Sequence, residues 1–177
     1  MTDTLVRRLL ADEVNDWRAL RLRALTDTPV NFGSTYDDEA SRPFEHWTER
    51  AARNAAGQES VMFVADQDGQ LQGMAGAYLD PEDALRPHLI SMWVAPAARR
   101  QGTGKALVDA VVAWARDLGH PGVRLFVVQG NTAAASLYRR CGFSPTGATV
   151  SLPRDAAILE DKMRLTFPVS GPARPAR

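Results

Sequence analysis

The sequence predicts a mixed α/β domain built on a largely antiparallel sheet. Two helix-patterned segments open the chain, short strands joined by tight turns follow, and the second half alternates strand, helix, strand, helix and strand. A chain of 177 residues that is 45% hydrophobic and 24% charged has the composition of one ordinary globular domain. We expect this single domain to cover residues 1–168, and residues 169–177 to form a disordered tail.

The N-terminal half contains two predicted helices and four predicted strands. The first helix covers Asp12–Leu25, where apolar side chains recur at helical spacing, and the second covers Phe44–Ala56 and ends at a glycine. Asp68-Gly69 is a strong signal for a hairpin turn between two strands. The predicted strands are Thr4–Leu10, Val61–Ala65, Leu71–Leu79 and His88–Val94.

The C-terminal half alternates between the two kinds of element. Leu107, Val108 and Val111 recur on one helical face, and Asn131 can cap a helix that begins after it. The predicted elements are helix Ala106–Leu118, strand Val123–Val128, helix Ala133–Cys141, and two pairing strands, Ala148–Leu152 and Ile158–Phe167.

The composition argues against several classes of function. Because 21 basic residues balance 21 acidic ones, the chain lacks the sustained positive field that nucleic-acid or membrane-surface binding needs. One cysteine, Cys141, excludes an internal disulfide and a cysteine-rich zinc site, and we expect no metal. The start lacks a secretory pattern, and no apolar stretch reaches the roughly 18 residues of a membrane helix. We expect a cytoplasmic protein without nucleic-acid or membrane partners.

The most informative motif is the glycine segment Arg99–Lys105, which reads Arg-Arg-Gln-Gly-Thr-Gly-Lys. It lies between a predicted strand and a predicted helix. Glycines let the backbone approach a ligand closely, and the free N–H groups and dipole of a helix start attract negative charge. Three basic side chains lie within the segment. It is therefore predicted to bind a phosphate-bearing molecule.

Two well-known phosphate-binding loops do not fit the glycine segment. A P-loop needs Ser or Thr after Gly104-Lys105, where Ala106 stands. A dinucleotide fingerprint needs a third glycine, where Leu107 stands.

The segment instead resembles the pyrophosphate loop of the GNAT superfamily of N-acetyltransferases, whose hallmark is Arg/Gln-x-x-Gly-x-Gly/Ala. Arg99, Gly102 and Gly104 occupy the hallmark positions. The resemblance is strongest over His88–Phe143 and extends over Leu5–Phe167. Further matches to the family, in the family's order, are Val94-Ala95-Pro96, Asn131, Ala134, Leu137-Tyr138, Gly142-Phe143, Asp161, Met163 and Leu165.

The resemblance implies the GNAT fold, with splayed central strands, and acetyl-CoA as the acetyl donor. The pantetheine arm would lie along the strand that ends at Val94 as an extra strand, and the Val94 N–H would polarise the thioester carbonyl. The alternative role of Met92, Trp93 and Val94 is that of a buried core strand, and the alternative role of Asn131 is that of a plain helix cap. The residues expected to bind acetyl-CoA are Met92, Trp93, Val94, Arg99, Arg100, Gln101, Gly102, Thr103, Gly104, Lys105, Asn131, Ala134 and Tyr138.

Acetyl transfer to an amine needs a proton for the leaving thiolate and a base for the amine. Tyr138 is the expected acid, because a phenol of pKa about 10 can protonate a thiol of pKa about 8.5 as charge develops; a core tyrosine is the alternative. His88 is the expected base, with Glu39, Asp80 or a water chain as alternatives.

The first two helices and the segment 144–155 are expected to shape the acceptor pocket, as in the family. The expected acceptor-binding residues are Phe32, Tyr36, Glu39 and Trp47. The sequence does not decide whether the acceptor is a small molecule or a protein N-terminus or lysine. A homodimer is expected from the resemblance, because dimers are common in the family.

These inferences predict an N-acetyltransferase that moves an acetyl group from acetyl-CoA to a primary amine. Direct attack is expected because the sequence shows no activated nucleophile for a covalent intermediate. The alternative function is a non-catalytic protein that binds acyl-CoA as a sensor or partner module. A longer acyl group or a hydroxyl acceptor also stays open.

Overall fold

Strands and helices follow one another along the chain much as the sequence predicts. The computed structural model describes residues 4–81 and 83–168. Within these ranges the strands are β1 (Leu5–Arg8), β2 (Ser60–Gln67), β3 (Gln70–Asp80), β4 (Asp83–Val94), β5 (Gly122–Val128), β6 (Ser144–Leu152) and β7 (Asp155–Thr166). The helices are α1 (Val14–Asp27), α2 (Tyr36–Ala40), α3 (Phe44–Ala56), α4 (Thr103–Asp117) and α5 (Thr132–Arg140), with short 3-10 helices η1 (Pro29–Asn31) and η2 (Pro96–Ala98).

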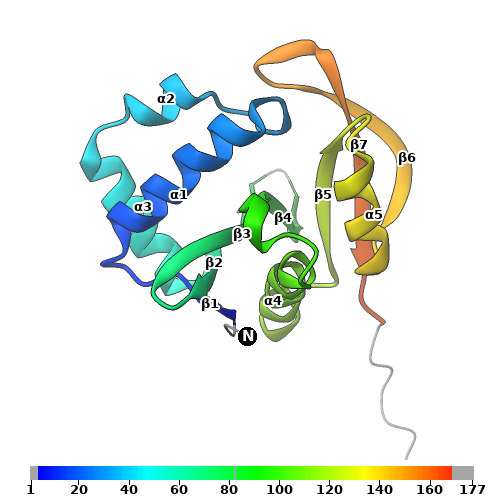
Figure 1. The fold of residues 1–177 in the computed structure, drawn as a ribbon. Helices are drawn as coiled ribbons and strands as arrows, with labels where there is room; N and C mark the ends of the chain where they lie inside the picture. Colours follow the sequence, from blue (N-terminus) through cyan, green and yellow to red (C-terminus); the bar gives the residue numbers. More distant parts are fainter. Residues whose placement is uncertain (1–3, 82, 169–177) are drawn as a thin grey trace, which may run out of the picture.

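The strands form one sheet in the order β1-β2-β3-β4-β5-β7-β6 (Figure 1). Neighbouring strands are antiparallel at β1–β2, β2–β3, β3–β4, β5–β7 and β6–β7, whereas β4 and β5 are parallel. This confirms the mixed, largely antiparallel sheet that the sequence predicts.

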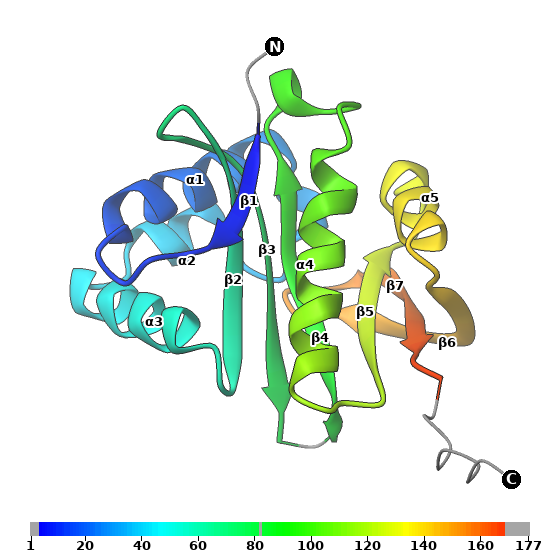
Figure 2. The same ribbon diagram turned by 90° about the horizontal axis from the view of Figure 1, so that it is seen from below.

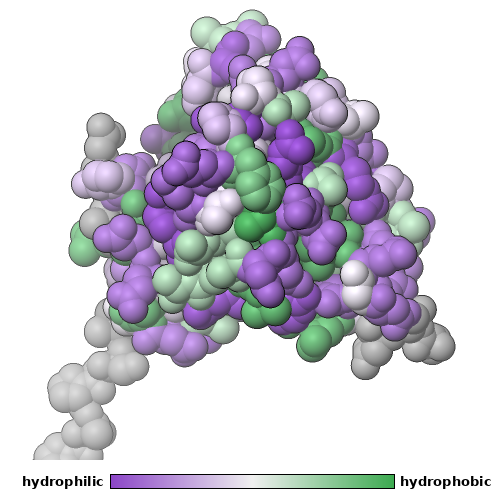
Figure 3. All heavy atoms as spheres, turned by 90° about the vertical axis from the view of Figure 1, so that its left-hand side faces the viewer, coloured by the Kyte–Doolittle hydropathy of each residue, from purple (hydrophilic) through white to green (hydrophobic). Residues whose placement is uncertain are grey.

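Two apolar cores lie on opposite faces of the sheet, because neighbouring strand residues such as Val64 and Ala65 belong to different cores. α1 and α3 cover one face of the N-terminal strands, and there Trp17 and Trp47 pack edge to face with ring centroids 5.2 Å apart. α4 and α5 cover the other face, as Figure 2 shows. The outward surface over α1–α3 is mainly hydrophilic, with small scattered apolar groups (Figure 3).

β4 and β5 pair for only two residues and then separate. Their register joins His88 to Arg124 and Leu89 to Leu125, and it ends there. The β3–β4 ladder breaks at the same level, where Ser91 and Met92 together lie opposite Ala75. Such a bulge bends a strand and disrupts its pairing. The splayed central strands implied by the GNAT resemblance are confirmed.

The structure differs from the prediction at α2. This five-residue helix begins with the capping box of Thr35 and Asp38, in which the Asp38 N–H donates to Thr35 Oγ1 at 3.1 Å and the Thr35 N–H donates to Asp38 Oδ2 at 3.0 Å. A helix this short shows no apolar periodicity, so the sequence pattern does not predict its extent. β4 and β6 also begin earlier than predicted, at Asp83 and Ser144.

None of the helices in the described ranges has the length and hydrophobicity of a membrane span. The predicted disordered tail, 169–177, lies outside the described residues. The single domain over 1–168 stays a prediction.

The bulge at Ser91 supplies a stability prediction. Ser91 has φ 57°, in the left-handed region that β-branched residues avoid. We expect Ser91→Val to lower the free energy of unfolding by about 1–3 kcal/mol, whereas Ser91→Gly, which suits this backbone, stays within about 1 kcal/mol of the parent. Urea unfolding followed by circular dichroism measures both. Equal stability of the two variants would contradict the bulge.

Candidate active site

The glycine segment spans the turn between η2 and α4 and the first three residues of α4. Its backbone takes two left-handed residues, Arg100 at φ 64° and Gly102 at φ 85°, and Gly102 caps α4. The first helical bond of α4 runs from the Ala106 N–H to the Gly102 carbonyl at 3.0 Å. The amides just before Ala106 have no partner inside the helix, so they can meet an anion at the positive end of the helix dipole.

Arg99 anchors the glycine segment from behind. Its Nε donates to the Val94 carbonyl at 2.8 Å, and its Nη2 donates to the carboxylate of Asp27 at the end of α1. Asp27 also accepts a hydrogen bond from Trp93 Nε1 at 2.9 Å. The Trp93 and Arg99 hydrogen bonds, the first being the stronger cause, hold the pKa of Asp27 below its usual range. Arg99, expected to contact phosphates, therefore has an anchoring role here.

Two other basic side chains of the glycine segment, those of Lys105 and Arg100, do not anchor it to α1 or β4 as Arg99 does. Lys105 Nζ lies 2.5 Å from Asp109 Oδ2, one turn further along α4, and both side chains are about half exposed. Arg100 is exposed. These two cations are the ones left to approach a bound phosphate.

A cavity of about 100 Å³ lies where β4 and β5 diverge. Four residues expected to bind acetyl-CoA line it, namely Met92, Asn131, Ala134 and Tyr138. Asn131 also caps α5, since its Oδ1 accepts from the Ala134 N–H at 3.1 Å, and its expected contact with acetyl-CoA stays a prediction. We refer to this cavity as the groove.

Gly104 brings α4 close to the groove. A Cβ at this position would lie 3.3 Å from the ends of both the Leu137 and Met92 side chains. The glycine therefore lets the helix begin tightly against β4 and α5, between the glycine segment and the groove.

Tyr138 lies at the inner wall of the groove and is 5% exposed. Its ring packs near Phe143, with centroids 6.0 Å apart. Over residues 4–81 and 83–168 its hydroxyl has no hydrogen-bond partner. Burial raises the pKa of this hydroxyl above its usual value, so the group keeps its proton. A protonated hydroxyl with an unused donor is the state that a general acid needs.

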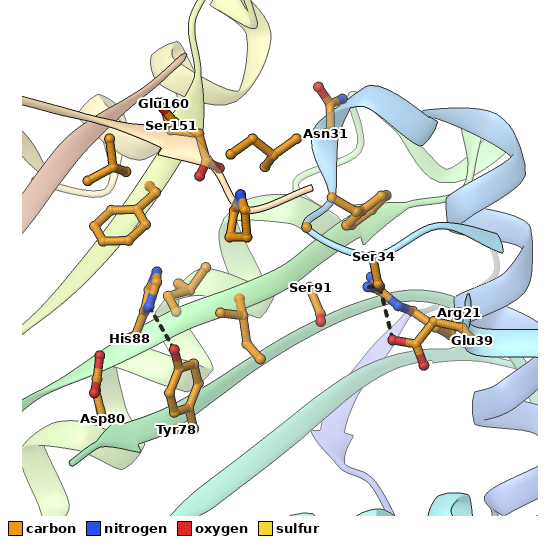
Figure 4. Close-up of a pocket in the computed structure, with 18 of the residues that line it drawn as sticks. Arg21, Asn31, Ser34, Glu39, Tyr78, Asp80, His88, Ser91, Ser151 and Glu160 are labelled. Carbon is orange, nitrogen blue, oxygen red and sulfur yellow. Dashed lines mark hydrogen bonds between the residues drawn. The ribbon is translucent and has the colours of Figure 1, made fainter. Parts of the chain in front are cut away.

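A larger cavity of about 500 Å³ adjoins the groove, and Figure 4 shows it. Its walls come from η1 and the N-terminal helices, from β4, and from the β6–β7 hairpin. The hairpin is tied to the opposite wall by Arg154, which donates from Nε to the Phe32 carbonyl at 2.8 Å and from Nη2 to the Pro29 carbonyl at 2.7 Å. The residues that both cavities share are Asn31, Phe32, Leu89, Ile90, Ser91 and Phe126.

His88 lies in the floor of the larger cavity and is 8% exposed. Its Nδ1 lies 3.3 Å from the Tyr78 hydroxyl, and its ring packs against Phe126 with centroids 4.4 Å apart. Burial, helped by the positive charge of Arg124, lowers the pKa of His88 to about 4. The ordinary histidine pKa, on which its expected role as the base depends, does not apply in this environment.

Two of the four residues expected to bind the acceptor line the larger cavity, and two do not. Phe32 and Glu39 belong to its wall. Trp47 is 0% exposed and lies on the face of α3 that packs in the core, so its expected contact with the acceptor is wrong. Tyr36 is exposed and borders a separate depression near Trp93, so it does not line the larger cavity.

Three charged residues of the larger cavity are not singled out by the sequence pattern: Arg21, Arg50 and Glu160. Arg21 lies in α1 and Arg50 in α3, and the pattern of a helix predicts that a charged residue faces solvent. Strand alternation could have indicated Glu160. Successive side chains of a strand face opposite sides of the sheet, so Glu160 and its neighbour Asp161 face opposite sides of β7. Asp161 indeed binds Gln129 Nε2 at 2.7 Å and does not line the cavity.

The model of the acetyltransferase (GNAT) family matches residues 15–143 of the chain. The chain belongs to the GNAT acetyltransferase family. The match begins in α1 and ends after α5, so it includes the glycine segment and Tyr138. The family resemblance seen in the sequence is confirmed.

Mycothiol acetyltransferases are among the relatives of this GNAT chain. The protein from Clavibacter sepedonicus is 31% identical over 144 residues, which cover 81% of this chain and 44% of that protein. The protein from Salinispora tropica is 35% identical over 138 residues, which cover 76% of this chain and 42% of that protein. The chain spans less than half the length of these relatives.

Solved GNAT structures share the fold. The acetyltransferase of the GNAT family from Streptococcus pneumoniae has a TM-score of 0.80 at 18% identity, covering 94% of this chain and 100% of that chain. The PaiA N-acetyltransferase from Thermoplasma acidophilum, in complex with coenzyme A, has a TM-score of 0.74 at 16% identity, covering 93% and 99%. At these identities the likeness establishes the fold.

The burial of His88 can be measured by its titration. We expect its ring signals, assigned with His88→Gln, to titrate by NMR with a midpoint near pH 4. Because the folded pKa lies below the ordinary value of about 6.5, the unfolded chain takes up this proton first, and His88 lowers stability as the pH falls from about 6.5 to 4. A midpoint near the ordinary value would contradict the buried, neutral ring.

Proposed function

We propose that the protein is an acetyl-CoA-dependent N-acetyltransferase that acetylates a primary amine by direct attack. The observation that carries this proposal is the meeting of the two cavities at the bulge of β4, beside Tyr138. The groove leads toward the glycine segment, and the larger cavity has room for a small acceptor. Membership of the GNAT family supports acetyl transfer as the chemistry.

The donor would bind along the path from the glycine segment to the groove. The amides of Gln101–Lys105 would hold the pyrophosphate of coenzyme A. The pantetheine arm would pair with the edge of β4 that β5 leaves open. The Ala95 N–H donates to the carbonyl of Gln72 in β3 at 2.7 Å. Because successive N–H groups of a strand point to opposite edges, the Val94 N–H points to the edge of β4 that β5 leaves open. The Val94 carbonyl is already bound by Arg99.

The thioester would lie beside Tyr138, where the two cavities meet. Ser91 and Met92 line the groove at this point, whereas Val94 does not. A backbone amide of the bulge is therefore better placed than the Val94 N–H to polarise the thioester carbonyl, which revises the expected donor.

The proposed reaction moves one acetyl group and balances its protons. The amine first loses a proton to a base or to water. Its nitrogen lone pair then forms the C–N bond at the thioester carbonyl carbon, and the C–S bond breaks. The departing thiolate takes the proton of the Tyr138 hydroxyl. The acetylated nitrogen then loses its second proton to solvent, and solvent returns a proton to the Tyr138 oxygen.

The proposal also includes a cytoplasmic location and a homodimer. Its acceptor is a small molecule or a protein N-terminus or lysine. A protein that binds acyl-CoA without turnover would share the glycine segment and the groove. The charged lining of the adjoining cavity supports turnover, because a sensor has no need of an acceptor pocket.

Tyr138→Phe tests the acid. Because the variant keeps the ring and loses only the donor, we expect kcat to fall at least about a hundredfold. The acetyl-CoA Kd measured by calorimetry should stay within about twofold of the parent, since neither ring packing nor the glycine segment changes. Tyr36→Phe, outside both cavities, is the matched control and should change neither quantity. An unchanged kcat in Tyr138→Phe would remove the tyrosine from the mechanism.

Gly104→Val tests the donor path. The added side chain would displace Leu137 and Met92 and narrow the passage between α4 and the groove. We expect the acetyl-CoA Kd to rise at least about tenfold, equivalent to about 1.4 kcal/mol. Ala106→Val, exposed in the same turn of α4, controls for the helix cost of a β-branched residue. Tight binding by Gly104→Val would show that the donor takes another path.

A further inference from the structure

Apart from His88 and Asp80, which pairs with Arg124, the charged side chains of the larger cavity lie on two of its walls. Arg21, Ser34 and Glu39 lie on the helical wall, Glu160 lies on the wall formed by the β6–β7 hairpin, and Ser91 lies between them (Figure 4). The helical wall is cationic and the hairpin wall is anionic, as the following contacts show.

Arg21 is a buried cation with unused donors. It is 6% exposed, its Nη2 donates to Ser34 Oγ at 3.0 Å, and its guanidinium carbon lies 4.5 Å from the centre of the Phe32 ring. Its Nε and Nη1 atoms are buried and have no hydrogen-bond partner. Burial lowers the pKa of Arg21 to about 10, which still leaves it charged at neutral pH. Buried donors without partners are rare. Among the described residues no carboxylate pairs directly with Arg21, so its charge favours an anionic group in the adjoining cavity.

The helical wall holds more positive than negative charge. Glu39 Oε2 lies 3.1 Å from Arg50 Nη1 and 3.5 Å from Arg42 Nε, while Glu39 Oε1 accepts from Ser34 Oγ at 2.9 Å. The Glu39 carboxylate thus pairs directly with Arg50 and Arg42, whereas it is linked to Arg21 only through the Ser34 hydroxyl. The wall keeps a cationic excess that favours an anionic group on the ligand.

Glu160 is an unpartnered carboxylate on the opposite wall. The residue is 9% exposed, and within residues 4–81 and 83–168 its carboxylate makes no hydrogen bond or ion pair. Lys162, two residues along the same face of β7, instead lies over the Phe126 ring at 5.3 Å. Burial raises the pKa of Glu160, which brings its basicity closer to that of an amine. A cationic group on the ligand would complete this wall.

We infer that the acceptor is an amine that also carries a carboxylate, as amino acids do, with its carboxylate toward Arg21 and its ammonium group toward Glu160. This inference rests on the proposed function and names its substrate class. The carboxylate of such a zwitterion faces the cationic helical wall, and its ammonium group faces the anionic Glu160. A polyamine would instead bring a second cation against Arg21 and Arg50.

The same arrangement supplies the missing base. The ammonium N–H bond breaks, its proton passes to the Glu160 carboxylate, and the lone pair stays on nitrogen for the attack on the thioester. Glu160 then takes the role expected for His88, whose ring is buried against Phe126 and carries a lowered pKa.

Matched acceptor pools test the substrate class without any variant. One pool holds the twenty common amino acids with β-alanine and γ-aminobutyrate, and the other holds the same compounds as carboxamides, which keep the amine and lose the carboxylate. We expect acetyl-CoA-dependent thiol release from the first pool with kcat/KM at least about tenfold higher. The lower amine pKa of the carboxamides favours the second pool, so the comparison is strict.

The outcomes separate the two proposals. Equal or higher kcat/KM for the carboxamides, or turnover of polyamines alone, would overturn the zwitterion and leave the acetyltransferase standing. Absence of acetyl-CoA binding by calorimetry, together with no thiol release from any amine, would overturn the acetyltransferase itself.

Two variants test the walls, and each has a control. Arg21→Gln should reduce the preference for amino acids over carboxamides at least about tenfold with an unchanged acetyl-CoA Kd. Arg23→Gln, on the same helix but outside the cavity, should not. Glu160→Gln should lower kcat/KM for the preferred acceptor at least about tenfold and flatten the rise of kcat with pH, whereas Asp161→Asn should change neither. A preference that survives Arg21→Gln would overturn the assignment of the carboxylate to that wall.

Discussion

The separation of β4 from β5 after Leu89 is the constraint on which the site depends. A sheet whose two central strands stayed paired would have no groove, and Tyr138 would be an ordinary core residue. The bulge at Ser91 and Met92 makes the separation possible, because it interrupts the regular β3–β4 ladder at the level where β5 leaves. Backbone polar groups on the freed edge of β4 then need partners, and an extended ligand can supply them.

Two side-chain anchors hold the elements around this opening. Asp27 joins the end of α1 to Trp93 in β4 and to Arg99 in the glycine segment. Arg154 joins the β6–β7 hairpin to η1 across the mouth of the larger cavity. Both link segments far apart in the sequence, so they define the site without being visible as local motifs. An exposed pair of this kind adds little to stability, but several hydrogen bonds on one carboxylate or guanidinium fix geometry well.

Local signals in the sequence predicted the elements, and long-range packing decided what the elements do. The Asp68-Gly69 turn and the apolar face of α4 depend on neighbours in the chain, and the structure shows them as predicted. The core position of Trp47 is not predictable, because an apolar helix residue gives the same pattern whether it faces a pocket or a core. The lowered pKa of His88 is not predictable either, because its burial against Phe126 depends on a strand more than thirty residues away. Glu160 is not predicted, because the family-like residue of this strand is its neighbour Asp161, which faces the other side of β7.

The proposed chemistry depends on a donor in the groove and an amine in the adjoining cavity at the same time. The most direct test is acetyl-CoA-dependent thiol release by the full chain, measured with and without a broad pool of primary amines. Release that rises with the amines, with formation of N-acetylated products by mass spectrometry, is the predicted result. Tight acetyl-CoA binding with release no faster than hydrolysis, whatever amine is supplied, would contradict the account and make the protein an acyl-CoA-binding module.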